Sequence, residues 1–269
     1  MSEALLKNKS SLFEKLFPVL LIVTIGLAFL VGVLWQKVEN LGKGGTTTTT
    51  DTTQQAQQPK KVALSQIKDL FNKDLIKFGD ENKKVIFVEI SDPSCPYCHV
   101  AGGLNPSLNS QIGPQFKLVK DGGTYIAPVP EMKKLVDSGK ASFVWIYYPG
   151  HGNGEMGAKA FYCANEKGKF WEVSDLLMTS AGYDLINNVV KNDKAQAGKL
   201  ADFLKSAINS TDMKSCLESG KYDSRLANDM AIAKDLGITG TPGFYVNDTN
   251  FAGAYSYKDM ESIVTSALK

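Results

Sequence analysis

Two cysteines separated by two residues are the groups in this sequence best suited to chemistry. Cys95 and Cys98 enclose Pro96 and Tyr97. Such a pair supports thiol–disulfide exchange when it lies in the first turn of a helix that follows a strand. There the first sulfur lies near unpaired N–H groups and the positive end of the helix dipole, which favour the thiolate that attacks disulfides. Pro96 suits the first helical position, because no N–H is needed there.

The residues before the pair provide the strand that this chemistry requires. Residues 85–90 read Val-Ile-Phe-Val-Glu-Ile, and four residues separate them from Cys95. A short run that is apolar on both faces is typical of a central strand in a covered sheet. We therefore predict that Cys95 is the nucleophile and that Cys98, one turn into the helix, is the shielded resolving thiol.

A Cys-x-x-Cys pair can also bind zinc or attach haem covalently. Zinc would need two further ligands, and the remaining candidates (Cys163, Cys216, His99 and His151) show no paired zinc spacing. The run Cys-Pro-Tyr-Cys-His from residue 95 matches the pattern of covalent haem attachment. The strand directly before the pair and the proline inside it argue against haem. We expect neither a metal nor a dissociable cofactor.

Glu89 is the one charged residue inside the apolar run. An unpaired carboxylate is costly to bury, so a buried glutamate has a raised pKa or a function. The alternative is an ordinary glutamate that faces solvent from an edge strand.

The other patterns predict alternating helices and strands. Helical spacing of Leu64, Ile67, Phe71, Leu75 and Phe78 predicts a helix over 63–78. The remaining expected elements are a helix over 130–138, a strand over 141–147, mostly helical residues from 157 to 236, two strands over 243–246 and 251–254 around an Asn247-Asp248 turn, and a last helix capped by Ser256. This order predicts an α/β sandwich with a helical insertion at about 152–221.

The N-terminal part has a different composition. Residues 16–35 are uncharged and mostly apolar, and as a helix they would span about 30 Å, the thickness of a bilayer core. A cleaved signal peptide is the alternative, but its apolar region is normally shorter. We predict a single transmembrane helix at 16–35 with residues 1–15 in the cytoplasm. The Thr/Gln-rich residues 36–61 are a predicted flexible linker, and residues 62–269 are the predicted folded domain.

Charge and composition exclude several classes of protein. The formal charge is only +2, and Arg225 is the only arginine, so a nucleic-acid surface is not expected. Four cysteines are too few for a disulfide-dense miniprotein.

Two motifs resemble one known family in the expected order. The run Glu89-Ile-Ser-Asp-Pro-Ser-Cys-Pro-Tyr-Cys-His99 resembles the start of DsbA-like, thioredoxin-fold disulfide oxidoreductases. The run Gly240-Thr-Pro-Gly-Phe-Tyr-Val-Asn247 resembles that family's second active-site loop, and residues 161–171 are similar to its helical insertion. The resemblance covers about residues 83–269. It departs from the family at 116–130, which is longer than usual, and it does not explain the helix expected at 63–78.

The resemblance implies roles for particular residues. Glu89 would relay the proton of Cys98. The Thr241-Pro242 bond would be cis, and its loop would offer the Thr241 backbone to a substrate strand. Pro96 and Tyr97 would also contact substrate.

Cys163 and Cys216 form the second cysteine pair. If Cys95 pairs with Cys98, these two are the partners that remain, and outside the cytoplasm an even count favours bridging. A disulfide here is therefore predicted. Two buried free thiols are the alternative.

These observations predict a membrane-anchored thiol–disulfide oxidoreductase whose catalytic domain lies outside the cytoplasm. Its expected partners are exported proteins with free thiols and a membrane quinone-linked protein that reoxidises it, and it is expected to be a monomer. The alternatives are a reductase or isomerase of the same fold, or a tethered binding protein without catalysis.

Overall fold

The computed structural model describes residues 62–269 of the chain. The predicted cytoplasmic residues 1–15, membrane helix 16–35 and linker 36–61 lie outside the described residues. Within residues 62–269, none of the helices has the length and apolar character needed to cross a membrane.

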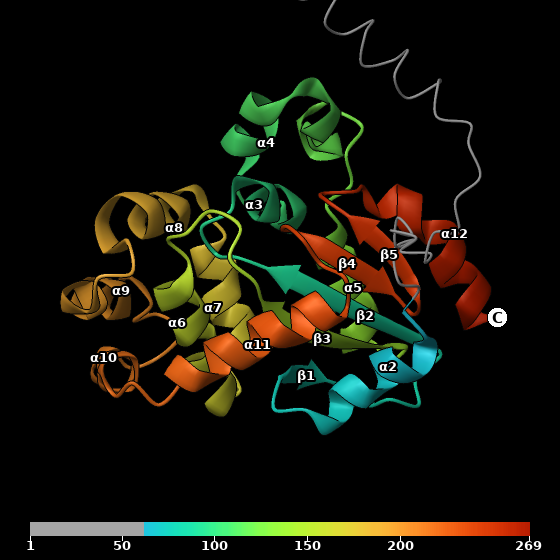
Figure 1. The fold of residues 1–269 in the computed structure, drawn as a ribbon. Helices are drawn as coiled ribbons and strands as arrows, with labels where there is room; N and C mark the ends of the chain where they lie inside the picture. The colour runs from blue at the N-terminus through green and yellow to red at the C-terminus, as the bar shows by residue number, and fades with distance from the viewer. Residues whose placement is uncertain (1–61) are drawn as a thin grey trace, which may run out of the picture. The chain divides into compact units, whose positions relative to one another are not determined.

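A five-stranded mixed sheet forms the centre of the fold (Figure 1). Its strand order is β1-β3-β2-β4-β5, and only β2 and β3 run parallel. The strands are β1 (Ile76–Phe78), β2 (Val85–Ser91), β3 (Ala141–Tyr147), β4 (Gly243–Val246) and β5 (Thr249–Ala252).

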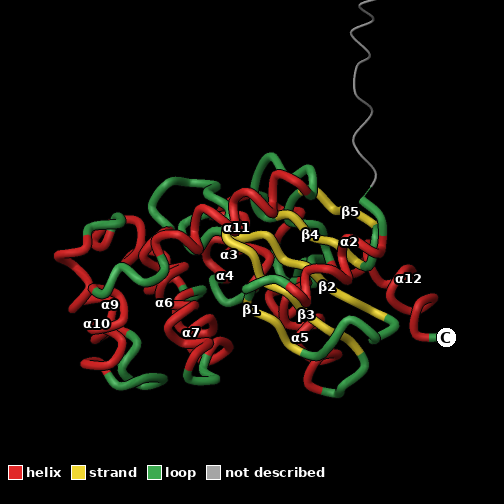
Figure 2. Tube along the Cα trace, turned by 60° about the horizontal axis from the view of Figure 1, so that its bottom comes forward, coloured by secondary structure: helices red, strands yellow, loops and turns green. Residues whose placement is uncertain are grey.

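Helices cover both faces of the sheet (Figure 2). The α-helices are α2 (Leu64–Asp69), α3 (Pro96–Gly102), α4 (Pro106–Ile112), α5 (Pro128–Asp137), α6 (Glu155–Glu166), α7 (Phe170–Leu177), α8 (Ser180–Asp184), α9 (Ala197–Phe203), α10 (Ser210–Glu218), α11 (Asp223–Asp235) and α12 (Tyr257–Leu268). Short 3₁₀ turns lie at Leu70–Asn72, Pro114–Phe116, Val119–Asp121 and Lys194–Gln196, and a π-helical turn at Leu185–Val190. Helices α2 and α11 pack on one face, whereas α3, α5, α12 and the helices from α6 to α10 belong to the core on the other face.

Strand β2 is central because its side chains are buried on both faces. Val85 and Phe87 belong to the core shared with α5 and α6, whereas Ile86, Val88 and Ile90 belong to the core under α2 and α11. This is the alternation expected of a strand covered on both sides. The predicted strand at 85–90 is confirmed.

The predicted helix over 63–78 is wrong in its second half. Helix α2 and one 3₁₀ turn end at Asn72, and Lys73 adopts an extended conformation. Leu75 packs in the core under α2 and α11, and Ile76 packs in the core on the other face of the sheet. Successive side chains on opposite faces are typical of a strand. Residues 76–78 pair antiparallel with residues 143–145 of β3. Pairing with the edge of the sheet therefore prevailed over the helical spacing of the apolar residues.

The other predicted elements lie where expected, with small shifts. The predicted strand at 251–254 is instead Thr249–Ala252, because Asn247 adopts a positive φ of 54° and closes a two-residue hairpin. Ser256 is the N-cap residue of α12, and its N–H donates to the Asp259 carboxylate at 3.1 Å. The helices between β3 and α11 occupy the predicted insertion.

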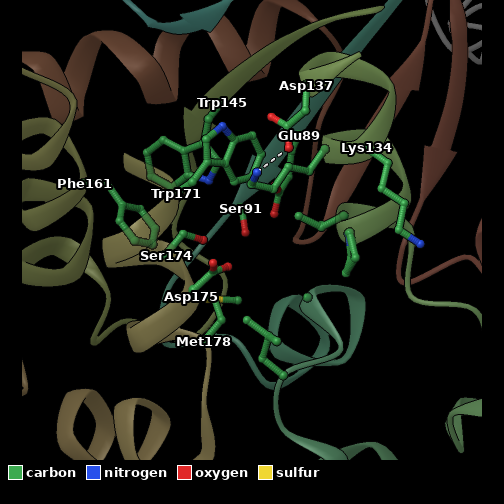
Figure 3. Close-up of a pocket in the computed structure, with 15 residues that line it drawn as sticks. Glu89, Ser91, Lys134, Asp137, Trp145, Phe161, Trp171, Ser174, Asp175 and Met178 are labelled. Atoms are coloured by element: carbon green, nitrogen blue, oxygen red, sulfur yellow. Dashed lines mark hydrogen bonds and ion pairs between the residues drawn. The ribbon is translucent and has the colours of Figure 1, made fainter. Parts of the chain in front are cut away.

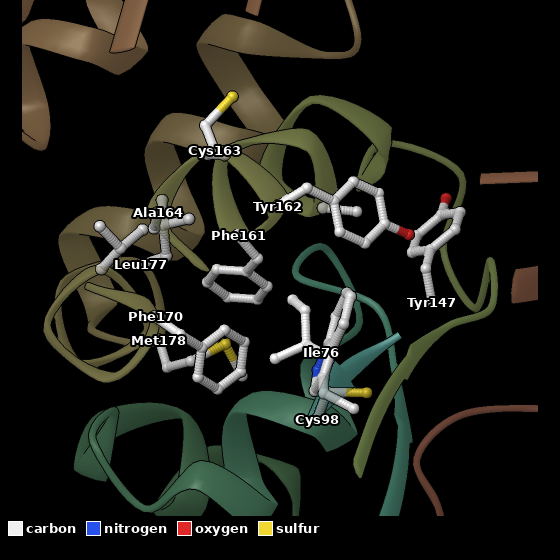
Figure 4. Close-up of a cluster of buried hydrophobic side chains, with 14 of the residues drawn as sticks. Ile76, Cys98, Tyr147, Phe161, Tyr162, Cys163, Ala164, Phe170, Leu177 and Met178 are labelled. Carbon is white, nitrogen blue, oxygen red and sulfur yellow. The ribbon is translucent and has the colours of Figure 1, made fainter. Parts of the chain in front are cut away.

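Aromatic side chains of the insertion pack directly against those of the sheet, so the two share one hydrophobic core (Figure 4). Trp145 of β3 packs edge-on against Phe161 of α6, with ring centroids 5.1 Å apart, and Phe161 packs against Phe170 of α7 at 5.2 Å. At the far side of α6, Cys163 forms a disulfide with Cys216 of α10. The disulfide therefore joins two helices of the insertion and does not touch the sheet directly.

Candidate active site

Cys95 and Cys98 lie at the start of α3, directly after β2. Cys95 is the N-cap residue, with extended backbone, and Pro96 begins the helix. Both thiols are free, and they differ in their surroundings. Cys95 is 4% exposed and its thiol donates to the Thr241 carbonyl oxygen at 3.4 Å, whereas Cys98 is fully buried and accepts from the Asp92 N–H at 3.4 Å.

The two thiols have opposite pKa shifts. A hydrogen bond from the Cys98 thiol lowers the pKa of Cys95 to about 6, helped by the Thr241 side chain and by the N–H groups of Cys98 and Tyr97, while burial opposes the shift. Burial raises the pKa of Cys98 well above its usual value, and the adjacent Cys95 thiolate raises it further. At neutral pH the reduced pair therefore holds one thiolate, on Cys95, and one thiol.

The Thr241-Pro242 loop faces Cys95, and its peptide bond is cis. The Thr241 hydroxyl is buried and has no fixed hydrogen-bond partner among residues 62–269, so it is free to turn toward the Cys95 thiolate. Gly150 approaches the same place from the loop after β3. A side-chain carbon on Gly150 would lie 1.8 Å from the Thr241 hydroxyl oxygen and 3.3 Å from Cβ of Cys95. A larger residue at position 150 would therefore force the Thr241 side chain to move.

Asp92 fixes the turn that carries Cys95, and the sequence analysis missed it. Its carboxylate is fully buried. One oxygen accepts from the Ser94 N–H and hydroxyl, both at 2.7 Å, and the other accepts from the N–H groups of Gly150 (2.7 Å) and His151 (2.8 Å). These four bonds tie the turn before α3 to the glycine-rich loop after β3. The Asp-Pro-Ser sequence, a turn former that bonds its own backbone two residues on, was the available signal.

His99 is fully buried behind the cysteine pair. Its two ring nitrogens lie 3.0 Å from the Met178 carbonyl oxygen and 2.9 Å from that of Pro93. A neutral imidazole can donate to only one of them, whereas a protonated ring donates to both. Burial lowers the pKa of His99, and the two carbonyl oxygens oppose this shift. His99 therefore links the active-site turn to the helical insertion.

Glu89 lies on β2, between β3 and β4, so the edge-strand alternative is wrong. It is 5% exposed, and burial raises its pKa to about 7. The Ser91 side chain, on the same face of β2 two residues on, lowers the pKa of Glu89 and also that of Cys98. Glu89 and Ser91 line the same cavity.

A cavity of about 280 Å³ connects Glu89 and Ser91 with the surface (Figure 3). Its aromatic wall consists of Trp145, Phe161 and Trp171, and charged side chains of α5 and α7 also line it. Glu89 therefore borders this cavity although only 5% of the residue is exposed.

Replacing Glu89 with Gln should stabilise the protein at alkaline pH. Between the usual pKa near 4.5 and the native value of about 7, the native state keeps a proton that the unfolded chain has lost. Stability therefore falls as pH rises through this window, by about 3 kcal/mol. Glu89→Gln removes this loss, so the free energy of unfolding should rise by about 3 kcal/mol at pH 8 and hardly at all at pH 4.

Denaturant titrations of the oxidised protein at the two pH values measure this difference. Glu261→Gln is the matched control, because Glu261 is exposed on α12. An equal gain at pH 4 and pH 8 for Glu89→Gln would show that the pKa of Glu89 is not raised in the native state.

Four residues were predicted to contact substrate, and the structure places two of them beside Cys95. Thr241 and Pro242 lie beside Cys95, as described above. Pro96 occupies the first position of α3, and Tyr97 is 44% exposed, with its ring edge-on to Phe116 at 5.7 Å. The second cysteine pair, Cys163 and Cys216, lies apart from this site in the insertion.

A sheet of this topology, with a cysteine pair at the first turn of α3 and a cis-proline loop against it, defines a thioredoxin-fold protein with a thiol–disulfide site. A family model described as Thioredoxin matches residues 130–266. This range is about half of the chain, and the chain belongs to this thioredoxin family.

Curated relatives are of two kinds. The Na(+)/H(+) antiporter NhaA 3 of Salinispora tropica is 25% identical over 193 residues, which are 70% of this chain and 24% of the antiporter. The chain thus spans about a quarter of the length of the first curated relatives it matches. A putative protein-disulfide oxidoreductase of Rickettsia conorii is 23% identical over 218 residues, which are 80% of this chain and 68% of that protein.

Solved structures share the fold. Oxidised BdbD from Bacillus subtilis is 21% identical, with a TM-score of 0.50 over 72% of this chain and 92% of BdbD. Wolbachia pipientis α-DsbA1 is 17% identical, with a TM-score of 0.53 over 72% of this chain and 91% of α-DsbA1. The predicted thioredoxin fold with a helical insertion is confirmed, and the relatives support the predicted class, a thiol–disulfide oxidoreductase.

Proposed function

We propose that this chain is a membrane-anchored thiol–disulfide oxidoreductase that introduces disulfides into proteins outside the cytoplasm. The observation that carries the proposal is the arrangement of the two thiols: Cys95 is the N-cap residue of α3 beside the cis Thr241-Pro242 loop, whereas Cys98 is fully buried. This arrangement lowers the pKa of Cys95 and raises that of Cys98. The name of the Rickettsia relative, a putative protein-disulfide oxidoreductase, supports the same activity.

The reaction begins with the Cys95–Cys98 disulfide. A substrate thiolate attacks the Cys95 sulfur, the bond between Cys95 and Cys98 breaks, and Cys98 leaves as a thiolate. Cys98 takes up a proton, which Glu89 can supply through Ser91. A second substrate thiolate then attacks the substrate sulfur of the mixed disulfide and releases Cys95 as a thiolate. The substrate loses two electrons and the protein gains them.

The stabilised Cys95 thiolate favours this oxidising direction. At pH 7, a pKa of about 6 instead of 9.0 stabilises the reduced form by about 1.4 kcal/mol. For a two-electron couple this corresponds to about 30 mV of additional oxidising power.

The proposal places the domain at a membrane. The uncharged residues 16–35 support a single transmembrane anchor with residues 1–15 in the cytoplasm, and residues 36–61 serve as the linker. The substrates are exported proteins with free thiols, and a membrane quinone-linked protein reoxidises the reduced pair.

The equilibrium of the Cys95–Cys98 pair with glutathione tests the proposal. We expect a reduction potential less negative than the roughly −270 mV of thioredoxin, and we expect the oxidised protein to form disulfides in a reduced, unfolded reporter such as ribonuclease. A potential near or below that of thioredoxin would indicate a reductase. The absence of any exchange with thiols would indicate a tethered binding protein.

A further inference from the structure

Residues 104–127 form a lobe above α3 (Figure 1). The lobe contains α4 and the 3₁₀ turns at Pro114–Phe116 and Val119–Asp121, and it includes most of the segment that is longer than in the resembling family. It has a small core of its own, formed by Val100, Leu118, Tyr125 and Ala127 with Ile112, Phe116 and Ala254. The lobe is therefore packed between the active-site helix and the loop after β5.

Hydrogen bonds hold the lobe to Tyr255 and Ser256 and to the first residue of α12. The Ile126 N–H donates to the Ser256 hydroxyl at 3.1 Å, and the Tyr257 N–H donates to the Ile126 carbonyl oxygen at 2.8 Å. The Tyr125 hydroxyl donates to the Tyr255 carbonyl oxygen at 3.4 Å. These bonds fix the position of the lobe relative to the end of the sheet.

Aromatic rings connect the cysteine motif with the lobe. Tyr97, between the two cysteines, packs edge-on against Phe116, and Phe116 packs in the same way against Tyr125 at 5.6 Å. Tyr255 is 46% exposed and its ring lies 5.5 Å from that of Phe251 on β5. Tyr97 and Tyr255 are thus both exposed to solvent, and Tyr255 lines the same hollow as Phe116.

A groove runs from the cis-proline loop to these rings. One hollow of about 280 Å³ is lined by Thr241, Pro242 and their neighbours. A second hollow, of about 330 Å³, is lined by Phe116, Tyr125, Tyr255 and neighbouring residues. Both hollows include Ala252 and Gly253 in their walls, so they adjoin each other along these two residues. The Gly253 N–H donates to the Pro242 carbonyl oxygen at 2.9 Å, which places the shared wall beside the cis-proline loop.

We propose that the lobe of residues 104–127 is a specificity element for the polypeptide substrate. An extended substrate segment occupies the groove, its cysteine reaches Cys95, and an aromatic side chain enters the hollow between Phe116 and Tyr255. The inference rests on the proposed function, because the reactive thiol at one end of the groove requires a cysteine-bearing chain.

The geometry sets the spacing and the chemistry of this substrate. Tyr255 follows Gly253 by two residues, and an extended chain advances about 3.3 Å per residue. The second hollow thus adjoins the first within a few residues of extended chain, and we take about three residues as the spacing to test between the substrate cysteine and its aromatic residue. Asp259 is the one acidic residue in the wall of the second hollow, and it already accepts the Ser256 N–H, so an uncharged ring fits better than a basic side chain.

Rates of mixed-disulfide formation with short peptides test the proposal. The oxidised full-length protein is mixed with reduced peptides that carry one cysteine and either Phe or Ser three residues before or after it. We expect the better Phe peptide to react about 10-fold faster than its Ser counterpart, the size expected for burying a phenyl ring. Tyr255→Ser should remove this preference, so that the Phe and Ser peptides react with the variant at equal rates. Val119→Ser is the matched control, since Val119 lies on the lobe, is 55% exposed and does not line the hollow.

The possible failures are distinguishable. Exchange with every peptide at the same rate, or a preference that survives Tyr255→Ser, would overturn the specificity role and leave the proposed function intact. A lack of exchange with any peptide would overturn both. A dimer of the wild-type protein that Tyr255→Ser dissociates would show instead that a second copy of the chain occupies the groove.

Discussion

Cys95→Ser should reduce thiol–disulfide exchange to the uncatalysed background, whereas Cys98→Ser should trap the protein as a mixed disulfide with its substrate. Cys95 is the thiol that a partner can reach, with the Thr241 carbonyl beside it, and its pKa of about 6 makes it a thiolate at neutral pH. Cys98 is fully buried, and it is the leaving group when a substrate thiolate attacks Cys95. In the reverse direction the Cys95 thiolate attacks a substrate disulfide, and the Cys98 thiolate then breaks the mixed disulfide. Cys98→Ser removes this second step and should therefore trap Cys95 on a disulfide-containing substrate. The two substitutions therefore have different outcomes: loss of exchange for Cys95→Ser, and a trapped mixed disulfide for Cys98→Ser.

The pH dependence of alkylation separates the two thiols directly. In the reduced protein the reaction of Cys95 with iodoacetamide should rise as pH increases through about 6, because only the thiolate reacts. Cys98 should stay unlabelled, since burial raises its pKa and closes access. Mass spectrometry of labelled Cys95→Ser and Cys98→Ser proteins provides the control. Equal labelling of both cysteines between pH 5 and 7 would contradict the assignment of the nucleophile.

The sequence predicted the parts of the site that depend on local order. A strand, a turn and a helix start follow one another within residues 85–98, so the spacing alone places Cys95 at a helix N-terminus. Burial of Glu89 followed from one charged residue inside an apolar run. These inferences need no knowledge of how distant segments meet.

Contacts between segments that are distant in the chain could not be predicted from the sequence. Asp92 bonds Gly150 across 58 residues, and nothing in the glycine-rich loop indicates that its N–H groups turn toward a carboxylate. The sequence suggests His99 only as a metal ligand or as part of a haem-attachment pattern, whereas the folded protein buries it against the Met178 carbonyl oxygen, 79 residues away. The error at 73–78 has the same origin, because β1 exists only through its pairing with β3.

Removing the Cys163–Cys216 disulfide should destabilise the protein strongly and leave the chemistry of the active site unchanged. The bond closes a loop of 53 residues that contains most of the insertion, from α6 to α10. In the chain-entropy model, a closed loop of this length stabilises the native state by about 4 kcal/mol, because the unfolded chain loses conformational freedom. The free energy of unfolding of Cys163→Ala/Cys216→Ala should fall by about this amount.

The same variant separates stability from redox chemistry. Cys163 lies on α6 and Cys216 on α10, in the insertion and away from the Cys95–Cys98 turn, so the glutathione equilibrium of Cys95–Cys98 should be unchanged at a temperature where the variant is folded. Denaturant titrations are best made with Cys95→Ser/Cys98→Ser in both proteins, so that only one disulfide differs. Ala158→Ser, a substitution at another fully buried position of α6, shows what a local packing change alone costs. A loss below about 1 kcal/mol would mean that the pair behaves as two small buried apolar groups rather than as a crosslink.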